Sequence, residues 1–386
     1  METKNIGLRG IEIADTRISN IDGEKGRLIY RGYDILELTK KSTFEETAYL
    51  LLYDDLPNKH QLDEFSAKLN EARYVPKQMQ KNMGNWRKDA DPMDMLQAFV
   101  AALAGYYDEE FSNKDASYDR AINLIAKVPT IIASWQRIRN GQELIDPDPS
   151  LSHAANFLYM MTGTRPLPEV EKIFDVCLIL HADHTFNAST FTARQVASTR
   201  AHMYSASSAA IGALSGELHG GANTEVMKML LEIGTQDVAG WIRQKIADGE
   251  RIMGMGHAVY KTYDPRARVL KDMSAKLAAK TGDPWFDITE SVENATISEM
   301  KSQKNHDIYP NVDLYSASIY YMLKIPMDLN TPIFAISRVA GWAAHIIEEK
   351  FAEAAPKPAL YRPKATYVGK YCGPEGCEYK ALNLRD

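Results

Sequence analysis

The sequence contains few cysteines, no long apolar run and no excess of positive charge. Its 386 residues carry a formal net charge of −6, so neither nucleic acid nor an anionic membrane surface is expected as a main partner. No apolar run reaches the ~18 residues that a membrane-spanning helix needs, and the first seven residues contain no apolar signal core. The expected location is therefore the cytoplasm.

Cysteine occurs at three positions. Cys177 lies in an apolar run and is expected in the core. Cys372 and Cys377 bracket a turn that contains glycine and proline, and this pair could form a disulfide or half of a metal site. Because no second pair is present and the expected compartment is reducing, two free surface thiols are the prediction.

Helical periodicity dominates the sequence after a short β-prone start. Residues 17–31 combine β-prone runs with a Gly-rich turn and predict a small hairpin. Ser42 with Glu45 matches a capping box and predicts a helix start. Pro129 predicts a kink or break, and the small residues of 203–214 predict a closely packed helix.

Further helices are expected over residues 91–103, 116–139, 152–162, 168–181, 189–202, 223–233, 237–248, 265–280, 285–301, 314–324 and 332–351. No alternation of strands and helices is visible. The predicted fold is therefore mainly α, with about fifteen to twenty helices.

The stretch 251–268 contains an unusual concentration of chemically capable residues. Gly254 and Gly256 precede His257, and glycines so close together let the backbone approach a ligand. Cations follow within a few residues, among them Arg266. A histidine on a glycine loop with cations behind it suits an anionic substrate whose carbonyl group must be polarised. The alternative is a turn followed by a basic amphipathic helix.

Two histidines, His181 and His184, stand three residues apart and would share one face of a helix. They could bind a metal, with Asp313 as a third ligand in a metal hydrolase, or they could interact with the dipole at a helix C-terminus. No HExxH or paired CxxC motif accompanies them. A metal site is therefore not the expected interpretation.

Four further residues have both a functional and a structural interpretation. His219 precedes two glycines and a helix start, where a neutral imidazole could stabilise an enolate or could simply be a loop residue. Asp313 could be a desolvated carboxylate base or an N-cap. Arg338 lies in an apolar helix and requires an anionic partner, whereas Arg362 by itself is an ordinary tail residue.

Together, these pieces resemble the citrate synthase family. The motifs Leu218-His-Gly-Gly-Ala-Asn223, Gly254-Met-Gly-His-Ala-Val-Tyr-Lys-Thr-Tyr-Asp-Pro-Arg266 and Pro310-Asn-Val-Asp-Leu-Tyr315 occur in the family's order. The segments 44–53, 181–189 and those around Arg338 and Arg362 match as well. The resemblance extends from about residue 7 to about residue 370.

The resemblance implies a mainly α-helical, two-domain, citrate synthase-like fold with the small N-terminal β-hairpin. Residues 1–220 and 328–386 would form the large domain, and residues 221–327 an inserted small domain. The sequence does not contain the N-terminal extension of hexameric, NADH-inhibited relatives. We therefore expect a homodimer without that regulation, in which Arg362 reaches the active site of the neighbouring subunit.

The resemblance also implies an acyltransferase reaction in which acetyl-CoA and oxaloacetate give citrate and CoA without a metal or cofactor. Asp313 would remove the methyl proton, His219 would hydrogen-bond the thioester oxygen, and His257 would polarise the oxaloacetate carbonyl. The carboxylates of oxaloacetate or citrate would be held by His184, Arg266, Arg338 and Arg362. CoA would be bound by Ile252, Met253, Gly254, Met255, Gly256 and Lys261, the last standing where arginine is common in the family.

Two alternatives remain open beside the metal hydrolase. A 2-methylcitrate synthase would use propionyl-CoA with the same catalytic residues, and one methylene is worth only about 1–3 kcal/mol of discrimination. A helical scaffold without enzymatic activity would not account for glycine-flanked histidines and three arginines suited to anions.

Overall fold

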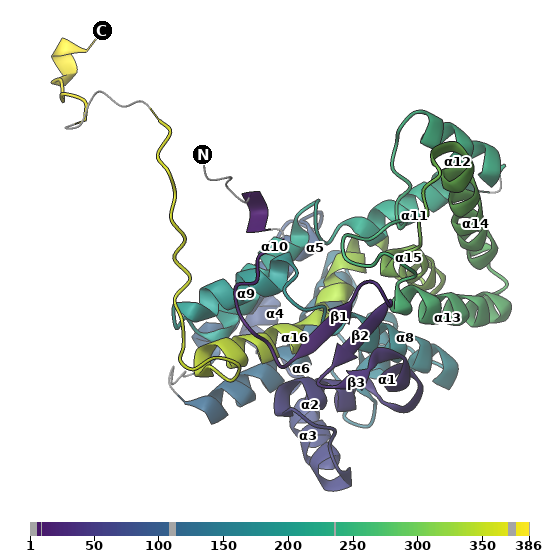
Figure 1. The fold of residues 1–386 in the computed structure, drawn as a ribbon. Helices are drawn as coiled ribbons and strands as arrows, with labels where there is room; N and C mark the ends of the chain where they lie inside the picture. The colour runs from purple at the N-terminus through teal and green to yellow at the C-terminus, as the bar shows by residue number, and fades with distance from the viewer. Residues whose placement is uncertain (1–5, 9, 108–112, 235–236, 370–375, 386) are drawn as a thin grey trace.

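The computed structural model describes residues 6–8, 10–107, 113–234, 237–369 and 376–385 (Figure 1). Within these residues the chain forms sixteen α-helices, four short 3₁₀-helices and one three-stranded sheet. The prediction of a mainly α fold is confirmed.

The sheet is antiparallel and consists of β1 (Ser19–Asp22), β2 (Arg27–Tyr30) and β3 (Tyr33–Asp34). Ser19 pairs with Tyr30 and Asp22 with Arg27, so a four-residue turn closes the first hairpin. The hairpin predicted within residues 17–31 is confirmed, and the structure adds the short third strand.

The helices up to Ser215 are α1 (Ile35–Lys41), α2 (Phe44–Tyr53), α3 (Lys59–Ala72), α4 (Lys77–Met83), α5 (Pro92–Ala102), α6 (Lys114–Arg139), α7 (His153–Thr162), α8 (Pro168–His181), α9 (Ala188–Ser198) and α10 (Met203–Ser215). The capping box of α2 is formed by Thr43 and Glu46, so the predicted pair Ser42 and Glu45 is wrong by one residue. Ser42 instead ends α1, because its N–H donates to the carbonyl of Leu38.

The centre of the core lies between α6 and α16 (Asn330–Phe351), the helix that crosses the middle of Figure 1. Trp135 of α6 and Trp342 of α16 are both fully buried. Pro129 lies inside α6 and does not divide it, so the predicted break is absent from this helix. The two longest helices of this region therefore pack on each other through their apolar faces.

The remaining helices are α11 (Ala222–Ile233), α12 (Val238–Ala247), α13 (Pro265–Thr281), α14 (Trp285–Lys304) and α15 (Val312–Met322). These five pack on one another at the upper right of Figure 1. They fall within residues 221–327, for which the sequence predicts an inserted small domain. The exact domain boundaries stay a prediction.

Beyond α16 the chain forms an extended tail that leaves the helical body at the left of Figure 1. Leu360 and Val368 on this tail are exposed to solvent. Cys377 is disulfide-bonded, so the prediction of a free thiol at this position is wrong. That prediction rested on the expected reducing compartment, which says nothing about how close two cysteines lie in the fold. Cys372 lies outside the described residues. No helix in the described part of the chain is long and apolar enough to cross a membrane.

Candidate active site

The loop that carries His257 is attached to the start of α15. Gly254 and Gly256 both have positive φ, at 79° and 84°. The Gly256 N–H donates to the carbonyl of Tyr309 at 2.7 Å, and the Asn311 N–H donates to the carbonyl of Gly254 at 2.9 Å. The glycines of this loop are thus required by its turns, and the expected approach of its backbone to a ligand stays a prediction.

The imidazole of His257 is oriented by its own loop. Its Nδ1 accepts from the N–H groups of Val259 at 2.9 Å and Tyr260 at 3.1 Å. Burial, together with the nearby Arg266, lowers the pKa of His257 to about 4, so the ring is neutral at pH 7. Because Nδ1 accepts, the single proton of the neutral ring is on Nε2. His257 therefore presents an N–H donor.

His184 lies beside His257, although 73 residues separate them in the sequence. The centroids of their rings are 5.4 Å apart, and Nε2 of His184 is 3.3 Å from the hydroxyl of Tyr260. Burial, the cation of Arg266 and the neighbouring His257 hold the pKa of His184 well below its ordinary value. Two neutral imidazoles therefore share one buried region.

Two buried guanidinium groups lie next to these histidines. Arg266 lies in the first turn of α13, and Asp264 accepts from its Nε at 3.1 Å and its Nη2 at 2.8 Å. Burial opposes this charge, but Asp264 keeps the pKa of Arg266 above its ordinary value. Arg338 of α16 donates from Nε to the His181 carbonyl at 2.7 Å and makes no ion pair with the described residues. Burial lowers the pKa of Arg338 to about 10.

Asp313 occupies the first turn of α15. The N-cap is Asn311, whose side chain accepts from the Asp313 N–H at 2.9 Å, so the alternative of an ordinary N-cap aspartate is wrong. Burial raises the pKa of Asp313 to about 6, although Arg266 and Arg338 partly oppose the rise. A carboxylate of this basicity is suited to accept a proton near neutral pH.

His219 faces the start of α9. The N–H of Ser189 donates to its Nε2 at 3.2 Å, and the Ser189 hydroxyl lies 2.9 Å from the same nitrogen. Because the backbone N–H can only donate, Nε2 is assigned as the acceptor and Nδ1 as the protonated nitrogen. Burial and the nearby Arg338 lower the pKa of His219 to about 4. His219 is therefore a second neutral donor, and the same Arg338 that lowers its pKa also lowers that of His184.

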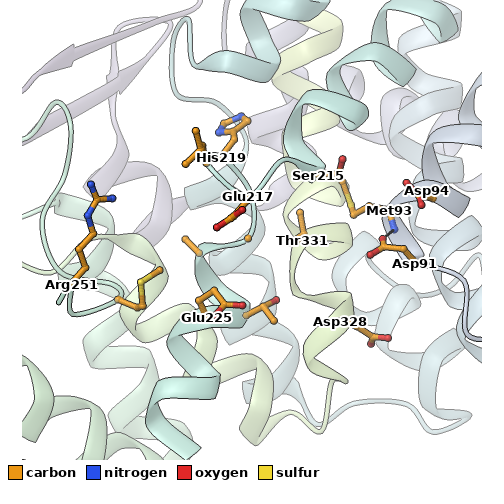
Figure 2. A pocket seen from close by; sticks show the side chains of 15 residues that line it. Asp91, Met93, Asp94, Ser215, Glu217, His219, Glu225, Arg251, Asp328 and Thr331 are labelled. Atoms are coloured by element: carbon orange, nitrogen blue, oxygen red, sulfur yellow. Dashed lines mark hydrogen bonds between the residues drawn. The ribbon is translucent and has the colours of Figure 1, made fainter. Parts of the chain in front are cut away.

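A cavity of about 920 Å³ opens beside His219 (Figure 2). Arg251 and Met253 contribute to its wall, next to the loop predicted to bind CoA. In Figure 2, Arg251 lies on the opposite side from Asp91 and Asp94. Other carboxylates of the wall are Glu217, Glu225 and Asp328. Among the described lining residues Arg251 is the one cation, and the sequence analysis did not assign it a contact.

His181 does not point with His184 toward a shared ligand. It is fully buried, its Nδ1 donates to the carbonyl of Cys177 at 2.7 Å, and its ring lies edge-on to Phe334. Burial lowers the pKa of His181 to about 3. Among the described residues, no group of three His, Cys, Asp or Glu side chains could hold a metal ion.

Two of the predicted residues stand apart from this group. Lys261 is exposed and forms an ion pair with Glu24 of the hairpin turn. Arg362 is exposed on the tail. The hydroxyl of its neighbour Tyr361 donates to Glu349 of α16 at 2.9 Å. A helix rises about 1.5 Å per residue, so Glu349 lies about 16 Å along α16 from Arg338. Neither residue contributes to the buried group within one chain.

Sequence reasoning missed Asp264, Tyr260 and Asn311. A signal existed for Asp264, because an aspartate before a proline commonly caps a helix, and Asp264 does cap α13. The contact of Tyr260 with His184 joins residues far apart in the chain and leaves no local pattern.

Among the residues named from the family resemblance, the three histidines His184, His219 and His257 share electrostatic interactions with Arg266 or Arg338, whereas Lys261 and Arg362 are exposed. Their roles stay predictions, and direct comparison decides the family. The family model described as "Citrate synthase, C-terminal domain" matches residues 7–364. The chain is 44% identical to the citrate synthase of Synechocystis over 95% of its own length and 91% of that protein. The chain belongs to the citrate synthase family.

Solved citrate synthase structures have the same fold. The chain is similar to the enzyme from Pyrobaculum aerophilum, with a TM-score of 0.90 at 42% identity, covering 98% of this chain and 95% of the other. It is also similar to the citrate synthase of Thermoplasma acidophilum in a ternary complex with carboxymethyl coenzyme A and oxaloacetate. That likeness has a TM-score of 0.89 at 34% identity over 99% and 100% of the two chains.

In this citrate synthase family member, Asp313→Asn is expected to increase stability above pH 6. The folded chain raises the pKa of Asp313 from 3.8 to about 6, so ionisation costs stability as the pH rises through that window. The cost stays constant at higher pH and is on the order of 1–3 kcal/mol. Melting temperatures at pH 8 and pH 3.5 measure it, with a gain for the variant at pH 8 alone.

Asp89→Asn is the matched control for this prediction. Asp89 is exposed, and its hydrogen bond with Arg87 lowers its pKa, so removing its charge should bring no gain at pH 8. An Asp313→Asn protein that melts no higher than wild type at pH 8 would contradict the destabilised carboxylate.

Proposed function

We propose that the chain catalyses the condensation of acetyl-CoA with oxaloacetate and water to give citrate and CoA. The observation that carries the proposal is the gathering of three neutral imidazoles, two buried guanidinium groups and one carboxylate of raised pKa. No metal or cofactor takes part in the proposed reaction, since hydrogen bonds and buried charges supply the polarisation.

The oxaloacetate would bind between Arg266, Arg338 and His184. Guanidinium groups pair with carboxylates through two parallel hydrogen bonds, which fixes the orientation of the anion. The charge of buried Arg338 is partly balanced by the carboxylate of Asp183 without a direct hydrogen bond to it, so a substrate carboxylate could add a direct ion pair. The Nε2–H of His257 would then donate to the substrate carbonyl and make its carbon more electrophilic.

The acetyl-CoA would be activated between Asp313 and His219. The Asp313 carboxylate takes a methyl proton while the Nδ1–H of His219 donates to the thioester oxygen, which stabilises the enol. The enol carbon forms a bond to the oxaloacetate carbonyl carbon as the thioester carbonyl re-forms, and the oxaloacetate oxygen takes the Nε2 proton of His257 to give citryl-CoA. The proton that Asp313 removed from the methyl group then replaces the one lost by His257, so that no proton is gained or lost overall. Water then cleaves the thioester and releases CoA. Exclusion of bulk water before condensation prevents loss of acetyl-CoA.

We assign the binding of CoA to the cavity beside His219 and to the loop from Ile252 to Gly256. Met253 lines that cavity, and Arg251 offers the cation that a phosphate group needs. Lys261 stays a proposed contact of CoA. To make this contact, Lys261 would have to leave its ion pair with Glu24 and pair with a phosphate group of CoA instead. Residues 221–327 form the proposed small domain that carries this loop.

We further propose a homodimer in which Arg362 completes the site of the partner subunit. Arg362 is exposed on a tail that leaves the body of its own chain. Leu360 and Val368 on the same tail are apolar and exposed, which fits a tail that packs on a second subunit. A two-fold arrangement would let each tail reach across in the same way. The cytoplasmic location stays a prediction from the sequence.

Thiol release with oxaloacetate tests the reaction and its acyl substrate together. Acetyl-CoA and propionyl-CoA are compared side by side, and kcat/KM is expected to be higher for acetyl-CoA. A hydrophobic pocket discriminates one methylene by about 10–200-fold at most, so both rates have to be measured. A preference for propionyl-CoA would identify a 2-methylcitrate synthase, and no thiol release from either would overturn the proposal.

The reaction should lose rate in acid, because the base must be ionised. With the pKa of Asp313 at about 6, kcat/KM for acetyl-CoA is expected to fall about tenfold per pH unit below pH 6 and to level off above it. Asp313→Asn should lower kcat by about 10²–10⁴-fold with oxaloacetate binding retained. Calorimetry measures that binding, and a variant that keeps a tenth of the rate contradicts the assignment.

A complementation experiment tests whether Arg362 acts across the interface. His257→Ala and Arg362→Ala are each expected to form nearly inactive dimers. Refolding them together gives about half hybrids by random pairing, each with one intact and one doubly damaged site, so about a quarter of wild-type activity should return. If mass spectrometry detects hybrids and activity stays at the level of the parents, Arg362 does not act in trans.

A further inference from the structure

The β1–β2 hairpin contacts both segments that carry the neighbouring histidines. At its open end, the hydroxyl of Tyr30 donates to the Asp183 carbonyl at 2.9 Å and accepts from the Asp183 N–H at 3.1 Å. Ser19, the strand partner of Tyr30, donates to the Asp183 carboxylate and accepts from the Thr185 N–H. These contacts bind the residues on both sides of His184.

The backbone after His184 has an unfavourable conformation. Thr185 has a φ of 49°, which a β-branched residue rarely adopts and which persists only where the surroundings enforce it. Its N–H is held by the Ser19 hydroxyl at 3.2 Å and by the Asp183 carboxylate at 3.0 Å. The path of the chain at His184 therefore depends on the hairpin.

At its closed end the hairpin packs backbone against backbone on the segment that follows His257. A methyl group at Gly23 would overlap the carbonyl oxygen of Val259, and one at Gly26 would lie 2.8 Å from the carbonyl oxygen of Tyr263. The Lys261 N–H donates to the Gly23 carbonyl at 3.0 Å. Only glycine allows an approach this close.

We propose that the β1–β2 hairpin is a positioning element for the condensation, holding the His184 segment at one end and the His257 segment at the other. A strand of four residues is about 10 Å long, so one short hairpin contacts both segments. The two segments carry imidazoles whose ring centroids are 5.4 Å apart, and the hairpin would fix that separation. The inference rests on the proposed function, since it assigns both histidines to oxaloacetate. The ion pair of Glu24 with Lys261 is exposed and contributes little beside the backbone contact.

Gly23→Ala tests the proposal, with Gly32→Ala as its matched control. Gly23 does not need positive φ, so its variant adds a steric contact alone, whereas Gly32 has a φ of 90° with nothing within 4 Å of an added methyl group. Gly32→Ala therefore adds strain in the same sheet without the contact. A displacement of about 1 Å can cost up to 10²-fold in rate. We expect Gly23→Ala to lower kcat/KM for oxaloacetate by about 10- to 100-fold.

The controls should separate positioning from stability. Gly32→Ala should lower the melting temperature and keep kcat/KM for oxaloacetate within twofold of wild type, and Glu24→Gln should keep both. Tyr30→Phe removes the hydroxyl at the other end of the hairpin and should also raise KM for oxaloacetate. If Gly23→Ala does not fold, the Tyr30→Phe result by itself tests the proposal. Equal kcat/KM for folded Gly23→Ala and Gly32→Ala, or an unchanged Tyr30→Phe, would overturn the proposal.

The wild-type assay keeps this inference separate from the proposed function. If wild-type chain releases no thiol from acetyl-CoA or propionyl-CoA, the proposed function fails. If wild type is active and the Gly23→Ala and Tyr30→Phe variants match it, the reaction stands and the positioning role of the hairpin is wrong.

Discussion

Burial of positive charge is the constraint on which the rest of the site depends. An ion taken out of water loses solvation worth several kcal/mol, and two guanidinium groups are buried here in one region. Asp264 neutralises Arg266 through direct hydrogen bonds, whereas Arg338 contacts a carbonyl group and an aromatic ring and is balanced only at longer range by Asp183. The remaining positive charge helps to keep the histidines neutral and limits the rise in the pKa of Asp313. An anionic substrate would satisfy it.

Because the imidazoles are neutral, the hydrogen bonds of their acceptor nitrogens decide what they can do. Each ring has one proton, and a backbone N–H on one nitrogen leaves that proton on the other. His257 receives these bonds from its own loop, and His219 receives one from the start of α9. Backbone geometry thus selects the tautomer of two residues that lie in different elements, while burial and the nearby arginines keep both rings neutral.

The sequence identified local features of the site well and long-range ones poorly. Gly254, Gly256 and His257 form a local pattern, and the structure uses the glycines as turns. The capping box of α2 shows how far a local pattern can be trusted. Ser42 and Thr43 are each followed three residues later by a glutamate, so the sequence alone does not say which of them caps the helix. The Phe44 N–H donates to Asp175, 131 residues away, which holds the start of α2 in a way that no local pattern reveals.

The site also contains features that cost stability, and the helical core offsets them. Thr185 is strained, Asp313 ionises where its surroundings raise its pKa to about 6, and Arg338 is buried without a direct ion pair among the described residues. Each is held by a segment anchored to a long buried helix or to the sheet rather than by its own preference. Since these segments are far apart in the chain, no short part of it can keep them in place. Precise positioning at the site therefore requires the packing of the whole fold around α6 and α16.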